Sequence, residues 1–142
     1  LVFHPFPGHP NSIAPGKSRT TGMSPTIVLK DDKPFIVTGA PGAVKILTGN
    51  LQTIVNVIDH NMSVQEAVAA PRIHSEGQWV DVEARLFYAL KDSMEEMGHK
   101  LVKSDLSYDP FFALVHAVLR DPITGNIDGA ADPRGRGGCA RV

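Results

Sequence analysis

The chain has 142 residues and a formal net charge of −1, and 42% of its residues are hydrophobic and 20% charged. One domain of a globular protein fits this length and composition. Near-neutral charge with scattered lysines and arginines argues against a nucleic-acid-binding protein, and no apolar run has transmembrane length. The single cysteine, Cys139, excludes a disulfide within the chain. Because the first residue is Leu1 and not methionine, we do not expect it to be the natural start.

Residues 1–22 are rich in proline and glycine and show no periodicity. A loop of this length in a compact domain is usually functional or disordered. We predict an ordered loop, with the apolar side chains Phe3, Phe6 and Ile13 available to pin it to a core. Residues 23–142 are predicted to build the layers of sheet and helix.

Two short strands are predicted next, at residues 26–30 and 34–38. Both segments carry the β-branched and aromatic residues that favour a pleated surface. The charged residues 31–33 between them supply the chemistry of a turn. This part of the chain therefore predicts a β-hairpin.

A glycine-proline loop at residues 39–43 follows the hairpin and precedes a helix that is predicted from apolar residues at helical spacing. These residues are Leu47, Leu51, Ile54, Val55 and Ile58. The backbone N–H groups of Gly42, Ala43 and Val44 would lie at the helix N-terminus, where negative charge is favoured. The loop is thus either an anion site or oxyanion hole, or a strand-to-helix turn without chemistry.

The rest of the chain alternates strands and helices. Ser63 and Glu66 form the pattern of a capping box ahead of a short helix that ends at Pro71. The further elements predicted are extended segments at 72–74 and 79–82, a helix at 84–97, and strands at 101–103, 113–120 and 127–131. Paired strands interleaved with helices indicate a layered α/β fold with largely antiparallel pairing.

Self-contained catalytic motifs are not found in this chain. The six histidines lack the spacing of a metal site, and neither a GxSxG elbow nor a Walker loop is present. Asp128 and Asp132 flank the last strand, where carboxylates are usually turn formers. We therefore predict no metal and no cofactor.

Taken together, a series of short motifs resembles the C-terminal part of the small subunit in the gamma-glutamyltransferase (gamma-glutamyltranspeptidase) family. The resemblance covers nearly the whole chain, and the motifs occur in family order and spacing. They are Phe3 with Pro7-Gly8, then 10–17 (PNSIAPGK), 23–28 (MSPTIV), 39–43 (GAPGA), 65–68 (QEAV), 70–74 (APRIH), 119–122 (LRDP) and 129–134 (GAADPR).

The resemblance implies an N-terminal nucleophile hydrolase with a four-layer αββα sandwich, of which this chain holds only the C-terminal part. Members cleave their own precursor and expose a threonine, whose hydroxyl attacks an amide carbonyl. That threonine precedes the segment matching Leu1, and Thr20 and Thr21 cannot replace it because neither has a free amine. The implied partners are the upstream large-subunit segment of the same precursor and a small-molecule amide, with no nucleic acid or membrane; a homo-oligomer is compatible with it.

Three sites are implied by the resemblance. Gly42 and Ala43 match the paired glycines whose N–H groups form the oxyanion hole. Thr21 and Gly22 match a Ser-Ser pair that holds the substrate α-carboxylate, so one hydroxyl is retained and one is lost. Val2 matches an aspartate that holds the substrate α-amino group in true transpeptidases, and valine cannot accept that hydrogen bond.

These matches leave alternatives for the function. The chain is part of an enzyme that cleaves gamma-glutamyl or related acyl amides, or part of an acylase or amidohydrolase not selective for gamma-glutamyl donors, or a non-catalytic scaffold. The compartment stays open: relatives are often periplasmic or secreted, and a cytoplasmic enzyme is compatible with the sequence.

Overall fold

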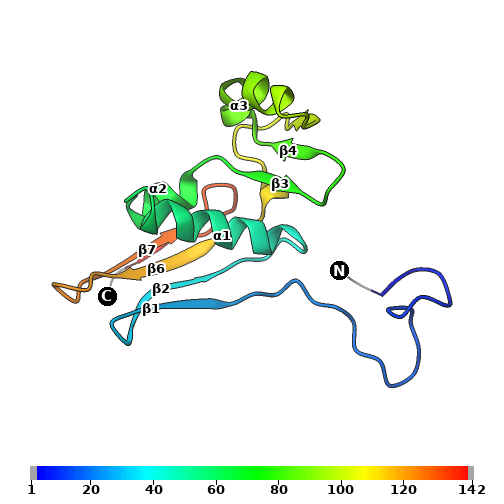
Figure 1. The fold of residues 1–142 in the computed structure, drawn as a ribbon. Helices are drawn as coiled ribbons and strands as arrows, with labels where there is room; N and C mark the ends of the chain where they lie inside the picture. The colour runs from blue at the N-terminus through cyan, green and yellow to red at the C-terminus, as the bar shows by residue number, and fades with distance from the viewer. Residues whose placement is uncertain (1–2, 141–142) are drawn as a thin grey trace.

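The computed structural model describes residues 3–140 and contains two sheets (Figure 1). The larger is a four-stranded antiparallel sheet in the order β1-β2-β6-β7. Its strands are β1 (Thr26–Lys30), β2 (Lys33–Gly39), β6 (His116–Arg120) and β7 (Ile127–Ala131). The predicted strands at 26–30 and 34–38 are confirmed, and the last two strands form the predicted hairpin.

The turn between β1 and β2 has a specific geometry. Asp31 and Asp32 both have positive φ, 52° and 57°, and Lys30 pairs with Lys33. This is the two-residue loop of a type I′ turn, whose twist matches that of the flanking strands. Aspartate tolerates the left-handed region better than most residues, so the charged turn read from the sequence closes the hairpin tightly.

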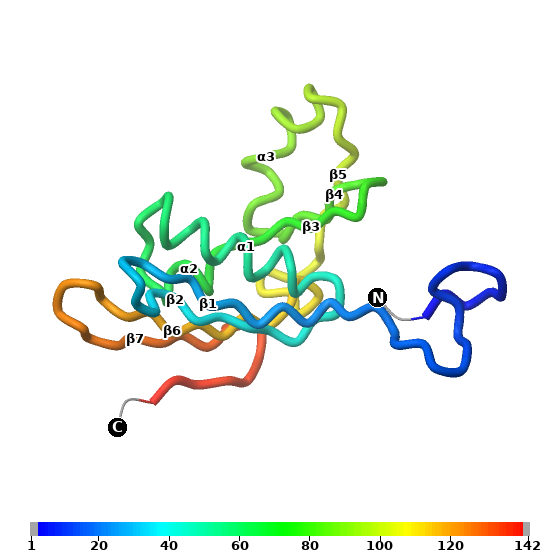
Figure 2. The backbone as a smooth tube through the Cα atoms, turned by 60° about the horizontal axis from the view of Figure 1, so that its bottom comes forward, coloured from blue at the N-terminus to red at the C-terminus, as the bar shows by residue number. Residues whose placement is uncertain are grey.

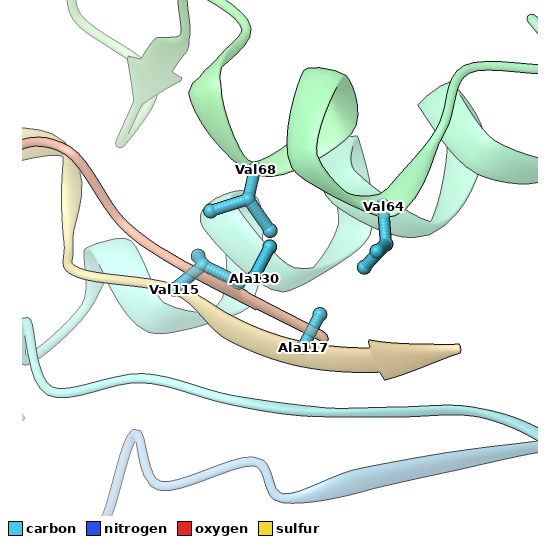
Figure 3. Packing of buried hydrophobic residues seen from close by; sticks show 5 residues of the cluster. All are labelled: Val64, Val68, Val115, Ala117 and Ala130. Atoms are coloured by element: carbon cyan, nitrogen blue, oxygen red, sulfur yellow. The ribbon is translucent and has the colours of Figure 1, made fainter. Parts of the chain in front are cut away.

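Two helices, α1 (Lys45–Ile58) and α2 (Val64–Ala69), cover one face of the large sheet. The capping box of α2 is present as predicted: the Glu66 amide donates to Ser63 Oγ, and the Ser63 amide donates to the Glu66 carboxylate. Figure 3 shows the core that results, in which valines of α2 pack on small side chains of the sheet. Its buried members are Val64, Val68, Val115, Ala117 and Ala130.

A second, smaller unit lies beyond α1 (Figure 1). Its strands are β3 (Ile73–Ser75), β4 (Val80–Val82) and β5 (Leu101–Lys103), in the order β3-β4-β5. The β3–β4 pair is antiparallel and the β4–β5 pair parallel, because helix α3 (Ala84–Glu96) crosses over between β4 and β5. A single 3₁₀ turn at Pro110–Phe112, which sequence reasoning did not predict, returns the chain to the large sheet.

The helices are where predicted, but the apolar spacing that predicted them does not mark their buried faces. In α1, Leu47 and Leu51 are exposed, and the helix instead buries Ile46, Gly49, Asn50, Thr53 and Val57. No residue of α3 is fully buried. Amphipathic helices normally bury their apolar stripe, but among the described residues both stripes are only partly covered, and α3 packs against β5 through one side.

The N-terminal loop runs along an extended path away from the sheets, as the blue segment of Figure 2 shows. Its own bonds include the pairing of His4 with Ser12. The expectation that Phe6 and Ile13 pin the loop to a core is wrong within the described residues, because these side chains are 69% and 76% exposed. Phe3 is half-buried.

Candidate active site

The loop between β2 and α1 has the backbone geometry of a tight strand-to-helix turn. Gly42 has φ of 148° and Ala43 has φ of 54°. The amides of Lys45 and Ile46 donate to the carbonyls of Gly42 and Ala43, so the first helical turn begins directly at the loop. Both positive φ values lie in regions that favour glycine, and Ala43 adopts its conformation at a cost of about 1–2 kcal/mol.

Gly42 is required by a close approach to another segment of the chain. A Cβ at this position would lie 2.5 Å from Ala113 Cβ and 2.7 Å from Ala113 Cα. The Leu114 amide donates to the Pro41 carbonyl, which holds the two segments together at this point. Ala113 itself has φ of 67°. The loop is therefore shaped by residues 113–114 as well as by its own glycine.

The N–H groups of Gly42 and Ala43 donate no hydrogen bond to any group in residues 3–140. Val44, at the N-cap of α1, offers no side-chain acceptor either. Unpaired N–H groups at a helix N-terminus carry partial positive charge and bind anionic oxygen. The geometry thus provides two adjacent donors of the kind that stabilise an oxyanion.

The predicted carboxylate-binding residues lie in the segment that leads into β1. Thr21 is exposed, and its hydroxyl accepts a hydrogen bond from the Met23 amide. Gly22 is buried. Two residues later, Asn50 of α1 donates to the Ser24 carbonyl at 2.9 Å, so this segment passes the first two turns of α1. The roles of Thr21 and Gly22 stay predictions, and Val2 lies outside the described residues.

A cluster of four buried charges, which sequence reasoning missed, lies at the C-terminal end of α2, where both arginines donate to the Val68 carbonyl. The four residues are Arg72, Glu83, Asp132 and Arg134. Arg72 Nη1 is 2.8 Å from Asp132 Oδ2, and Arg134 Nη1 is 3.0 Å from Asp132 Oδ1. Arg134 also binds both carboxylate oxygens of Glu83, at 2.9 and 2.6 Å. Each charge is paired, as buried charges must be.

The cluster shifts the pKa values of its members. Burial by itself would raise the pKa of Asp132, but the charges of Arg72 and Arg134, with the amides of Arg134 and Val115, hold it below its usual value. Burial, together with repulsion from Arg134, lowers the pKa of Arg72. For Arg134, burial acts in the same direction, but its bonds to Glu83 and Asp132 prevail and raise the pKa.

The charge cluster also reaches the segment that packs against the loop between β2 and α1. Arg72 Nη1 donates to the carbonyls of Phe112 and Ala113, and Asp132 Oδ2 accepts from the Val115 amide. These bonds hold the segment against which Gly42 packs. The prediction that Asp132 is a turn former is confirmed, because its carboxylate accepts from the Arg134 amide and its carbonyl accepts from the Gly135 amide. Its burial within the charge cluster was not predicted. The sequence signal that could have indicated this burial is a charged residue within a run of small apolar residues. Such runs are AAPRI around Arg72 and GAADPR around Arg134.

No group of three or more histidine, cysteine, aspartate or glutamate side chains within residues 3–140 is placed to hold a metal ion. Among the helices of the same residues, none has the length and apolarity needed to cross a membrane.

Comparison with known proteins identifies the family. Residues 2–142 match the family model described as gamma-glutamyltranspeptidase. The acylase ACY 1 proenzyme of Pseudomonas sp. (strain SE83) is 45% identical over 102 residues, which are 72% of this chain and 18% of that protein. The glutathione hydrolase proenzyme of Escherichia coli (strain K12) is 36% identical over 131 residues, covering 89% of this chain and 21% of that protein. The chain thus spans about a fifth of these relatives.

Solved structures agree with the sequence comparison. An acivicin-inhibited gamma-glutamyltranspeptidase superposes with a TM-score of 0.79 at 38% identity, over 89% of this chain and 68% of that chain. The cephalosporin acylase of Bacillus halodurans gives a TM-score of 0.79 at 30% identity, over 93% of this chain and 24% of that chain. The fold is that of the gamma-glutamyltranspeptidases, which are N-terminal nucleophile hydrolases, as expected. The chain belongs to the gamma-glutamyltranspeptidase family.

Proposed function

We propose that this chain is the C-terminal part of an enzyme that cleaves gamma-glutamyl or related acyl amides through an acyl-enzyme. The nucleophile is the hydroxyl of an N-terminal threonine in a segment upstream of Leu1, and its α-amine is the base. That segment and the large subunit are the partners of this chain in one precursor. The acyl group then passes to water or to an amine.

In this reaction, Gly42 and Ala43 form the oxyanion hole. Attack on the amide carbonyl places negative charge on its oxygen, and two N–H groups already aimed at that oxygen stabilise it without reorganisation. The observation that carries the proposal is that both N–H groups stay without an acceptor in residues 3–140. The helix N-terminus adds its partial charge in the same direction. A backbone donor needs no particular side chain, so alanine at position 43 retains the function.

The test is Gly42→Ala in the full-length precursor. A Cβ at this position collides with Ala113, so the loop must shift and misplace both donors. Because misplacement by about 1 Å can cost on the order of a hundredfold in rate, we expect a loss of that size in kcat. Gly39→Ala is the matched control, since a Cβ there meets nothing within 4 Å.

Circular dichroism and the extent of subunit cleavage report whether each variant is folded and mature. An unchanged kcat for a mature Gly42→Ala enzyme would contradict the oxyanion role. Equal losses in both variants would contradict it as well, because Gly39 contributes no donor to the site.

A second candidate function, an acylase not selective for gamma-glutamyl donors, has its own support. Valine at position 2 offers no acceptor for an α-ammonium group, and Gly22 removes one hydroxyl from the expected carboxylate site. The similarity to the acylase ACY 1 proenzyme points the same way. A site that lacks a partner for a charged group loses its selectivity for the ligand that carries it.

The two functions are distinguished by comparing kcat/KM for a gamma-glutamyl anilide with kcat/KM for a glutaryl anilide, which lacks only the α-amino group. Near-equal values are expected for the acylase. A preference of several orders of magnitude for the gamma-glutamyl compound would contradict it and would indicate an ammonium site elsewhere in the protein. For the acylase, Val2→Asp should shift the preference toward the gamma-glutamyl anilide.

A further inference from the structure

The side-chain amide of Asn50 is buried in the second turn of α1, where the residue is 3% exposed. A buried polar group costs free energy unless its hydrogen bonds are made. Replacing such a group and its partners by apolar side chains of the same shape is often close to neutral for stability. A buried amide therefore has its clearest use in fixing how the segments that it joins are placed, as a single buried asparagine does in coiled coils.

The nitrogen end of this amide binds the segment that leads into β1. Asn50 Nδ2 donates to the Ser24 carbonyl at 2.9 Å and to Ser24 Oγ at 3.2 Å. A carbonyl can only accept a hydrogen bond, so the amide nitrogen must face this segment. Ser24 follows Gly22 by two residues, and the Met23 amide between them donates to the Thr21 hydroxyl. Asn50 thus holds the chain directly next to the predicted carboxylate-binding residues.

The oxygen end of the amide binds the end of β2. Thr38 Oγ1 lies 3.2 Å from Asn50 Oδ1, to which it donates, and 3.2 Å from the His116 carbonyl. Thr38 is 3% exposed and directly precedes the loop at residues 39–43. The same side chain that holds Ser24 therefore also holds the point at which the loop leaves the sheet.

Both segments are placed relative to one rigid element, α1. The helix begins two residues after the loop, and the Lys45 amide donates to the Gly42 carbonyl, so the first helical turn fixes the loop relative to the helix. The Asn50 amide fixes the segment with Ser24 relative to the same helix. Asn50 therefore sets the separation between the predicted carboxylate-binding residues and the N–H groups of Gly42 and Ala43.

We propose that Asn50 is a positioning residue, which through this separation sets the selectivity for acyl donors that carry an α-carboxylate. The assignment rests on the proposed amide-cleaving function and deepens it. In a gamma-glutamyl or glutaryl donor, a short carbon chain joins the amide carbonyl to the carboxylate. The carbonyl oxygen reaches the loop and the carboxylate reaches Thr21 together only if these two segments lie at the matching separation.

The experiment compares two donors of the full-length mature enzyme that differ only by the carboxylate. The 4-nitroanilides are the gamma-glutamyl and 4-aminobutyryl compounds or, where the enzyme prefers glutaryl, the glutaryl and butyryl compounds. The readout is the ratio of kcat/KM for the carboxylated donor to that for the donor without the carboxylate. Asn50→Val removes both bonds of the amide and should lower this ratio about tenfold, because the bonds to the carboxylate are misplaced.

Two further variants sharpen the result. Thr38→Val keeps the shape of the side chain and removes only the bond to Asn50 Oδ1, so it should lower the ratio about two- to threefold. This variant carries the test if Asn50→Val does not mature. Thr53→Val is the matched control, because Thr53 is equally buried in α1 but its hydroxyl donates to the Gly49 carbonyl of the same helix. It should leave the ratio unchanged.

A merely structural role of Asn50 would lower kcat/KM for both donors equally, so an unchanged ratio in the mature variants would overturn the assignment. An equal fall of the ratio in Thr53→Val would overturn it as well. A wild-type ratio near one would show that the enzyme does not select the carboxylate; the positioning role then fails while the amide-cleaving function stands. If the wild-type enzyme cleaves none of these anilides, the proposed function fails, and the assignment fails with it.

Discussion

The two faces of the large sheet differ in what covers them. On the inner face, Ile36, Ala117 and Ala130 are buried under α1 and α2. On the outer face, Ile27 pairs with Val37 and Val37 with Val118, and these side chains form an apolar row across three strands. They are 62%, 43% and 43% exposed.

This difference indicates that the sheet is built to be covered on both faces. An antiparallel sheet with one face in water normally alternates apolar and polar residues, but here both faces are apolar. Apolar patches of this kind mark interfaces. Since the chain spans about a fifth of its curated relatives, we expect the outer face to be covered by another part of the same precursor.

The largest effect on stability is expected for the buried charge cluster, which lies on the same side of the sheet as α2. Asp132→Ala leaves Arg72 and Arg134 without their shared carboxylate, and breaking a buried pair costs about 3–5 kcal/mol. The free energy of unfolding of the full-length protein, from denaturant titration, should fall by this amount. Asp128→Ala, at an exposed position of β7, should change it by less than about 0.5 kcal/mol. Similar changes in the free energy of unfolding for the two variants would show that the stability of the protein does not depend on the cluster.

The same cluster can be weakened by pH. The pKa of Asp132 is held below its ordinary value of 3.8, so the unfolded chain binds the proton more readily than the folded one. The contribution of this carboxylate to stability is therefore complete above pH 3.8 and is lost as pH falls through the folded pKa. Denaturant titrations across this range should show the loss, and Asp132→Asn should lack that part of the slope. An identical slope in Asp132→Asn would contradict the assignment.

The outer face is tested by a charge placed in the middle of its apolar row. Val118→Lys should reduce the self-association that we expect of the isolated chain, measured by light scattering, because it breaks the exposed apolar patch. In the full-length protein the same change should destabilise by about 1–3 kcal/mol, because the lysine is buried under the covering segment. Ile123→Lys, at a fully exposed turn residue, is the control. A monodisperse wild-type chain that unfolds cooperatively would contradict the need for a cover.

The smallest effect is expected at the loop where β2 turns into α1. Ala43→Gly removes the strain of the left-handed conformation at this residue. Glycine also gives the unfolded state a greater entropy, which offsets part of this gain, so the net stabilisation should be up to about 1 kcal/mol. The amide is retained, so kcat should be retained as well. Ala40→Gly has no positive φ to relieve and should destabilise. A loss of stability in Ala43→Gly would show that the alanine side chain makes contacts that outweigh its strain.

The elements of this fold could be predicted because their causes are local. The β-branched residues of β1 and β2, the aspartates of the turn and the capping box of Ser63 and Glu66 act within a few residues. The loop at residues 39–43 was predicted for the same reason, because the first N–H groups of a helix have no partner within the helix.

The sequence by itself thus determined the strands, the helices, the family and the glycine loop that precedes α1. Only the tertiary structure decided which apolar residues are buried, since Leu47 and Leu51 show the spacing of a buried stripe and yet are exposed. It also decided that Asp132 lies in a charge cluster with residues up to 60 positions away, such as Arg72. Burial and ion pairing depend on what other segments bring to the same place, and no local pattern in the chain specifies that.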